Sequence, residues 1–145
     1  MKKIIKKTGL TESEKLMFSD FMDWFNLDAK EKDGKKFKFD DPEFQSFLIN
    51  NGITLNSKSI IVPNIKKTNI IYYDVKKSKV RDLARHIRNA YAHSLITKKQ
   101  DKFYLKDTYD HKLTMNGKIS INSMKGLLEA IRNNKCDRDK TNVNK

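Results

Sequence analysis

Two arginines and two histidines lie close together between Leu83 and His93, a concentration of chemically useful side chains that the rest of the chain does not repeat. They are Arg85, His86, Arg88 and His93. An imidazole changes charge near neutral pH, and a guanidinium holds a phosphate through N–H groups in a fixed plane. These residue types therefore favour proton transfer or binding at a phosphate ester.

The same segment lies on a predicted helix from Lys79 to Ile96, with Ser78 as its N-cap. Each helical residue advances by about 100°, so one broad face is apolar except for Ser94 and should belong to the core. That face consists of Val80, Leu83, Ala84, Ile87, Ala90, Tyr91 and Ser94. The other side gathers Asp82, Arg85, His86, Asn89 and His93.

Arg88 does not share a face with His93 on this predicted helix. The two side chains are about 140° apart on the helical wheel, and Arg88 lies at the border of the apolar face. Two arrangements would bring them together. Either the helix distorts near His93, or a second copy of the chain supplies the missing partner.

The residues Arg88-Asn89-Ala90-Tyr91-Ala92-His93 resemble the signature of HEPN domains, an Arg followed by a polar residue and then a His four to six positions after the Arg. The preceding Arg85-His86-Ile87 also resembles small bacterial members of that family. The resemblance covers the region from Lys77 to Asn133. It implies a mainly α fold, namely a HEPN-like bundle of about four helices, and a two-fold dimer that joins both motifs in one cleft.

The resemblance also implies a function, which is metal-independent RNA cleavage by a phosphodiesterase of the hydrolase class, often a toxin or phage-defence effector. His93 would be the general acid or base, and Arg88 would hold the scissile phosphate and stabilise charge growing on its oxygens. Toxins of this family that pair with a nucleotidyltransferase often carry a Tyr two residues after the motif His. Leu95 stands there, which puts that mode of neutralisation in doubt.

The neighbouring polar residues have less specific roles. Asn89 lies one turn before His93 on the same side, so it could orient the imidazole or contact the substrate. Arg85 and His86 could contact RNA phosphates or shift the pKa of His93, and simple surface exposure is the competing interpretation. Both remain candidate RNA-binding residues. His111 falls in a predicted turn and is interpreted as a bystander.

The chain carries 31 Lys and Arg against 18 Asp and Glu, which gives a formal net charge of +13. A positive field of this size concentrates polyanions near the surface, so RNA is the first partner to expect. The competing interpretation is compositional, because Lys, Asn and Ile are abundant throughout this sequence. The net positive charge therefore supports the RNA-binding interpretation of the motif but does not establish it alone.

Cys136 is the single cysteine, which excludes an internal disulfide and a thiolate-rich metal cluster. The histidines show no zinc-binding spacing, and no glycine-rich phosphate loop is present, so neither a metal nor another cofactor is expected. No apolar run has the length of a signal peptide or a membrane span. The sequence thus predicts a cytoplasmic protein that does not enter a membrane.

The chain should form one domain over residues 1–134, followed by a polar, disordered tail at 135–145. Thr11 to Glu14 has the form of a capping box and predicts a helix to about Asn26. A charged loop follows from Asp28 to Lys38, and Asp41-Pro42 starts a second helix that stops at Asn50-Asn51-Gly52. The stretch 53–73 is either two short strands or extended segments that wrap the helices.

The C-terminal part predicts a small antiparallel β-meander from Phe103 to Ile121. Asn116-Gly117 is a strong hairpin signal and is interpreted as its second turn. A last helix should run from Met124 to Asn133, capped by Asn122 or Ser123.

Two functional hypotheses remain from the sequence. The first is an endoribonuclease in which the 2′-hydroxyl of the RNA attacks the neighbouring phosphate, with Arg88, Asn89 and His93 in the cleft of a homodimer. The second is a non-catalytic module that binds RNA or a protein partner through the same basic face. A cognate antitoxin or another defence-system protein would be a further partner.

Overall fold

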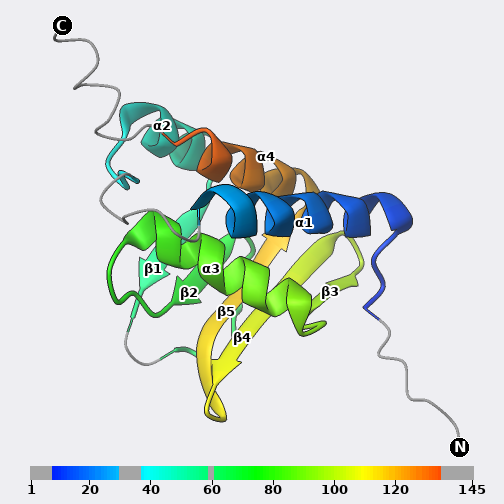
Figure 1. Ribbon diagram of the computed structural model, residues 1–145. Helices are drawn as coiled ribbons and strands as arrows, with labels where there is room; N and C mark the ends of the chain where they lie inside the picture. The colour runs from blue at the N-terminus through cyan, green and yellow to red at the C-terminus, as the bar shows by residue number, and fades with distance from the viewer. Residues whose placement is uncertain (1–7, 30–36, 59–60, 135–145) are drawn as a thin grey trace, which may run out of the picture.

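The computed structural model describes residues 8–29, 37–58 and 61–134. Within them the chain forms a central five-stranded sheet with helices on one face (Figure 1). Most of the predicted charged loop at Asp28 to Lys38 lies outside the described residues, as do Cys136 and the predicted tail at 135–145.

The sheet has the strand order β1-β2-β5-β4-β3. β1 (Thr54–Ser57) runs parallel to β2 (Ile70–Tyr73), and every other neighbouring pair is antiparallel. The remaining strands are β3 (Ile96–Lys99), β4 (Lys102–Tyr109) and β5 (Lys112–Ser120). β2 pairs with β5 across a large separation in sequence, so the N-terminal and C-terminal parts share one sheet.

The predicted fold class is wrong. A mainly α, HEPN-like helical bundle was expected, whereas the chain is mixed α/β, with strands distributed from Thr54 to Ser120. The stretch 53–73 supplies β1 and β2, so its β-branched and aromatic residues form strands rather than wrap helices. The predicted meander from Phe103 to Ile121 is a single hairpin of two longer strands, β4 and β5, and β5 joins it to β2 in one sheet.

Capping residues fix where the helices begin. In α1 (Glu12–Trp24) the Glu14 backbone N–H donates to Thr11 Oγ1 at 3.1 Å, and the Thr11 N–H donates to Glu14 Oε1 at 2.8 Å. This confirms the predicted capping box. The helix continues as a π-helical segment, η1 (Phe25–Ala29). α2 (Pro42–Asn50) starts after Asp41, as predicted.

The central helix α3 (Lys79–Ala92) is shorter than predicted. Ser78 is its N-cap as expected, but Ser94 adopts a left-handed conformation with φ 59°. The Leu95 N–H then donates to the Ala90 carbonyl at 2.8 Å, which completes a Schellman termination. Ile96, the last residue of the predicted helix, therefore begins β3.

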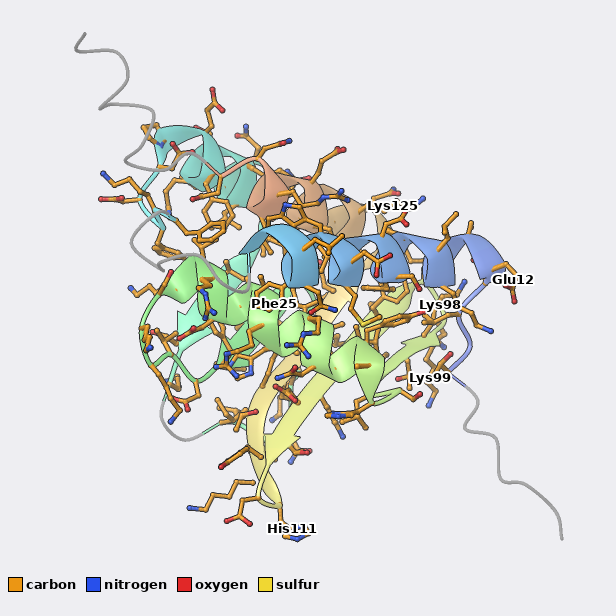
Figure 2. The ribbon with its side chains drawn as sticks, in the orientation of Figure 1. Glu12, Phe25, Lys98, Lys99, His111 and Lys125 are labelled. Carbon is orange, nitrogen blue, oxygen red and sulfur yellow. The ribbon has the colours of Figure 1, made fainter. Side chains whose placement is uncertain are left out.

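The β4–β5 hairpin turns at Asp110 and His111, which have φ values of 52° and 67° (His111 is labelled at the hairpin tip in Figure 2). The predicted turn at Asn116-Gly117 is wrong, because both residues lie inside β5. Asn116 Nδ2 donates to the Val62 and Pro63 carbonyls at 3.0 Å. A Cβ on Gly117 would come within 2.9 Å of Ile71 Cγ1, so close strand packing explains this glycine.

The hydrophobic core lies between the sheet and the helices. Phe18 of α1 contacts Phe103 of β4 edge to face at 5.3 Å between ring centroids. The last helix, α4 (Ile121–Arg132), starts earlier than predicted, with Ser120 as its N-cap, and buries Met124, Leu127, Leu128 and Ile131. Among the described residues, no helix has the length and apolar character needed to span a membrane.

Candidate functional site

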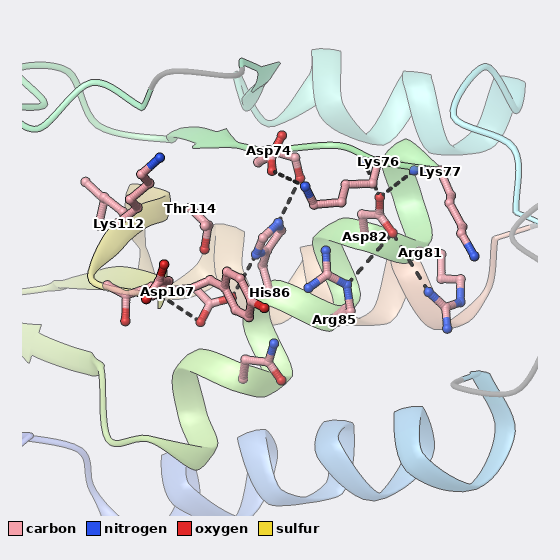
Figure 3. A pocket seen from close by; sticks show the side chains of 15 residues that line it. Asp74, Lys76, Lys77, Arg81, Asp82, Arg85, His86, Asp107, Lys112 and Thr114 are labelled. Carbon is pink, nitrogen blue, oxygen red and sulfur yellow. Dashed lines mark hydrogen bonds and ion pairs between the residues drawn. The ribbon is translucent and has the colours of Figure 1, made fainter.

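A groove of about 850 Å³ lies between the polar side of α3 and the β4–β5 hairpin (Figure 3). The segment before α3 closes one end of it. Both cationic and acidic side chains line its wall. The cations are Lys76, Lys77, Arg81, Arg85 and Lys112, and the carboxylates are Asp74, Asp82, Asp107 and Asp110.

The groove contains three of the five predicted site residues. Arg85, His86 and Asn89 line it, as expected from their common side of the helix. Arg88 and His93, which carry the predicted chemistry, are not among its lining residues. Asn89 is therefore the one residue of the Arg88 to His93 motif that lines the groove.

His86 is buried and held at both ring nitrogens. Its Nδ1 lies 2.8 Å from Asp107 Oδ2, and its Nε2 lies 2.8 Å from the Asp74 carbonyl oxygen. Only 2% of the His86 residue surface is exposed, and the same holds for Asp107. The pair connects α3 to β4, while the second bond holds the segment that follows β2.

The hydrogen-bond partners determine what His86 can do. A carbonyl oxygen only accepts, so Nε2 carries a proton and donates it to Asp74. The contact between Nδ1 and Asp107 Oδ2 also needs one proton, which one of these two atoms carries and donates to the other. Neither nitrogen has a free lone pair for a substrate. His86 thus stabilises the fold beneath the groove and does not contact RNA with its ring as the structure stands.

Asp82 accepts the backbone N–H groups before the N-terminus of α3 that could otherwise bind an anion. Its Oδ2 accepts the backbone N–H groups of Lys76 at 2.8 Å, Lys77 at 2.9 Å and Ser78 at 3.4 Å. Its Oδ1 lies 3.8 Å from Arg81 Nη1 and 4.0 Å from Arg85 Nε. The protein's own carboxylate fills this end of the groove, so a phosphate would have to bind farther along it.

Asp82 should make folding sensitive to acid. Burial by itself raises the pKa of Asp82, but the backbone hydrogen bonds from Lys77 and Lys76 and the charge of Arg85 outweigh it and lower this pKa. The unfolded chain therefore binds the proton first as the pH falls, so the stabilisation is complete above the ordinary Asp value and is lost as the pH falls through the folded value.

Replacing Asp82→Asn should cost about 1–3 kcal/mol of unfolding free energy at neutral pH, because the charged acceptor is lost. We expect the difference between Asp82→Asn and the parent to shrink as the pH falls through the folded pKa of Asp82. Urea unfolding at a series of pH values measures both quantities. A difference that stays constant down to strongly acidic pH would contradict this role.

Arg88 lies on the opposite flank of α3, against the π-helical segment. Its Cζ is 5.3 Å from the centroid of the buried Phe25 ring, and Arg81 Cζ approaches the same ring at 5.8 Å. Its Nε is buried and makes no hydrogen bond to a described residue. Burial and the charge of Arg85 lower the pKa of Arg88, and Asp107 opposes that shift. The guanidinium thus rests on an aromatic ring with donor capacity unused.

His93 is the C-cap of α3 and is exposed. Its backbone N–H donates to the Asn89 carbonyl at 3.0 Å, which keeps it in register with the last helical turn. No hydrogen bond holds its ring among the described residues. No described contact joins His93 to Arg88, so helix distortion does not bring the two together within one chain.

Tyr91 packs against the core and is not available to an outer surface. Its ring stacks on Phe18 at 5.5 Å, and its hydroxyl lies 3.1 Å from Ser19 Oγ and from the Lys15 carbonyl oxygen. The exposed residues at this end of the helix are Ala92, His93 and Ser94. A partner copy would therefore meet a small, polar surface around His93.

Asp107 is the site residue that the sequence analysis missed. Phe103 and Leu105 precede it at alternating positions of β4, and their side chains point to the core. Asp107 is the next residue of β4 whose side chain points inward. A carboxylate at such a position indicates a buried charge that needs a partner. His86 is that partner.

No group of three or more His, Cys, Asp or Glu among the described residues is placed to hold a metal ion. Compared with models of known protein families, with curated proteins and with solved structures, the chain matches none of them.

Proposed function

We propose that the protein is a metal-independent endoribonuclease that works as a homodimer. Its resemblance to HEPN proteins is carried by the residues Arg88 to His93 and not by the fold, so the proposal rests on these side chains. The observation that carries it is the position of the motif. His93 stands exposed at the end of α3 with its ring unbound within the described residues, and Arg88 is partly exposed one turn earlier, although its Nε is buried.

The reaction needs no protein nucleophile, because RNA carries its own. The 2′-hydroxyl oxygen attacks the adjacent phosphorus, and the bond from phosphorus to the 5′-oxygen breaks. His93 takes the 2′-hydroxyl proton as general base while water protonates the departing 5′-oxygen, or it gives its own proton to that oxygen as general acid while water accepts the 2′-hydroxyl proton. Arg88 stabilises the charge on the phosphate oxygens, and Asn89 orients the substrate or the imidazole. The products are a 2′,3′-cyclic phosphate and a 5′-hydroxyl.

A dimer is part of the proposal, since Arg88 and His93 lie on different flanks of one helix. A two-fold axis beside the end of α3 would place Arg88 of one subunit near His93 of the other. RNA in the cytoplasm is the substrate, and the biological role is that of a toxin or phage-defence effector. Expression of such an enzyme slows bacterial growth unless a cognate antitoxin or defence partner restrains it.

Incubation of the purified protein with labelled single-stranded RNA in excess EDTA tests the proposal. The parent should generate fragments that end in a 2′,3′-cyclic phosphate, and His93→Ala should cut about 10²–10⁴-fold more slowly, because a general acid or base is lost. Circular dichroism should show His93→Ala folded as the parent, since the residue is exposed. Equal cleavage by both proteins would exclude His93 as the catalyst.

A non-catalytic RNA-binding module is the second candidate. It is favoured by the basic side chains of the groove and by the locked ring of His86, which leave binding groups in place without a complete acid–base pair in one chain. The same assay separates the two candidates. Binding without cleavage by the parent and by His93→Ala alike would support the module.

A further inference from the structure

The face of the sheet turned away from the helices differs in charge from the rest of the protein. The five strands contain six lysines, at positions 98, 99, 102, 106, 112 and 118, but only one acidic residue, Asp107. Asp107 is buried on the helix side and paired with His86. The strands therefore present no carboxylate on this open face, which Val62 and Pro63 cover at Asn116. The groove beside α3, by contrast, carries four carboxylates.

Side-chain alternation assigns the lysines of this face. On β4 the buried Phe103 and Leu105 point to the helices, so Lys102, Tyr104 and Lys106 point the other way. On β3, Lys98 reaches Glu14 of α1 at 3.2 Å, which places its neighbours Thr97 and Lys99 on the open side. On β5, Lys118 stands beside Tyr104, with its Nζ 5.8 Å from the ring centroid.

We name these residues the lysine face: Thr97, Lys99, Lys102, Tyr104, Lys106 and Lys118. Strand register places them in adjoining rows, since Tyr104 pairs with Thr97 on one side and with Lys118 on the other. Lys99 pairs directly with Lys102. Like charges opposite each other across a strand pair destabilise a sheet, so this pair favours a bound anion between its ends. Asp101, in the turn between them, is the nearest acidic residue in sequence.

Tyr104 lies in the middle of the lysine face and is only partly buried. Its hydroxyl makes no hydrogen bond to a described residue. An aromatic ring flanked by lysines on an open sheet is the arrangement on which unpaired bases stack while the cations meet the backbone phosphates. Lys118 now covers part of the ring, but its long side chain can turn to a phosphate and leave the ring to a base.

From these observations we infer that the lysine face binds single-stranded RNA, with Tyr104 stacking on a base and Lys102, Lys106 and Lys118 contacting phosphates. The choice of RNA as the polyanion rests on the proposed function, whereas the surface itself does not involve Arg88 or His93. An acidic protein segment would use the lysines but would gain little from Tyr104. Tyr104 is thus the residue that distinguishes the two ligands.

The test measures the affinity of a fluorescein-labelled oligouridine for the full chain by anisotropy, over a range of salt concentrations. All proteins carry His93→Ala and the buffer contains EDTA, so cleavage does not disturb binding. Tyr104→Leu should weaken binding about 5- to 100-fold, as the loss of one stacked base does, and Tyr104→Phe should stay near the reference. A duplex RNA of equal length should bind more weakly than the single strand and should not respond to Tyr104→Leu.

The charge contribution is tested with the triple variant Lys102→Gln, Lys106→Gln, Lys118→Gln. The slope of log affinity against log salt should fall by about 2, since each phosphate contact to a single strand contributes about 0.7. The matched control removes three lysines from the helical layer, Lys15, Lys79 and Lys125, for the same change in net charge. The control should leave the slope near that of the reference protein.

Two results would overturn the inference. One is an equal loss of binding in the triple variant and in its control, which would reduce the effect to net charge. The other is unchanged binding by Tyr104→Leu, which would leave the lysines as a surface for any polyanion. If the triple variant does not fold by circular dichroism, Lys106→Gln alone, at an exposed position, should still lower the slope by about 0.7. Because all proteins in the test lack His93, failure here leaves the cleavage proposal standing.

Discussion

Mixing Arg88→Ala subunits with His93→Ala subunits should restore RNA cleavage that neither variant shows alone. In a heterodimer one composite site keeps the arginine of one subunit and the histidine of the other, while the second site has neither. With random exchange the mixture should therefore reach about a quarter of the parental activity. The measurement is the rate of fragment formation after subunit exchange, which a mass difference between the two variants can follow.

The controls address folding and exchange. Arg88 lies over Phe25, so Arg88→Ala should lose a little stability, about 0.5–2 kcal/mol, but remain folded. Arg88→Lys keeps a cation above the ring and loses the planar pair of donors, so it should melt nearer the parent and still cut slowly. Confirmed exchange without recovered activity would contradict a shared site, and a monomer at the concentration that cuts RNA would contradict the dimer.

His86→Leu should cost about 3–5 kcal/mol of the unfolding free energy, because it leaves the Asp107 carboxylate buried without its partner. The Asp74 carbonyl also loses its donor. This loss is a large fraction of the stability of an ordinary domain, so the variant should unfold at much lower urea concentration. Urea titrations followed by circular dichroism give the value.

The double variant His86→Leu, Asp107→Leu separates pairing from packing. It removes both polar partners, so it should be less destabilised than His86→Leu despite carrying one more substitution. His93→Ala, at an exposed histidine of the same helix, should change the unfolding free energy by less than about 0.5 kcal/mol. If the double variant loses at least as much unfolding free energy as the two single variants together, His86 and Asp107 contribute through packing alone.

Local signals in the sequence predicted three of the four α-helix starts, whereas α4 begins after Ser120 and not after the predicted Asn122 or Ser123. Thr11, Asp41 and Ser78 cap the helices as expected, because a side-chain oxygen satisfies backbone N–H groups within three residues. The end of α3 was missed for a related reason. A Schellman termination normally shows a glycine, and here Ser94 adopts the left-handed conformation.

Local patterns indicated strands between Phe103 and Ile121 but could not predict one five-stranded sheet. β1, β2 and β3 have four residues each, which is too short for a clear alternation, and β2 finds β5 only through the tertiary fold. Asn116-Gly117 imitated a hairpin turn. Contacts with residues distant in sequence explain the two residues instead, since Gly117 makes room for Ile71 and Asn116 donates to the Val62 carbonyl.

The candidate site was predicted in part. Helical geometry correctly placed Arg85, His86 and Asn89 on one side of α3, where they line the groove. The role of His86 could not follow from the helix, because its partners Asp74 and Asp107 come from other segments. The suggested roles of Arg88 and His93 remain predictions, which the subunit-mixing experiment tests.

The position of β2 beside β5 means that the sheet cannot assemble in the order in which a ribosome delivers its strands. β2 emerges early, but its antiparallel partner appears only after α3 and most of the C-terminal hairpin have been synthesised. A parallel pair of four-residue strands is too small to persist alone, and joining it to a distant strand requires a large loop to close. Ile71 and Tyr73, which are buried in the folded protein, therefore lack their β5 neighbours until β5 has been synthesised, and exposed apolar strands of this kind are prone to aggregate.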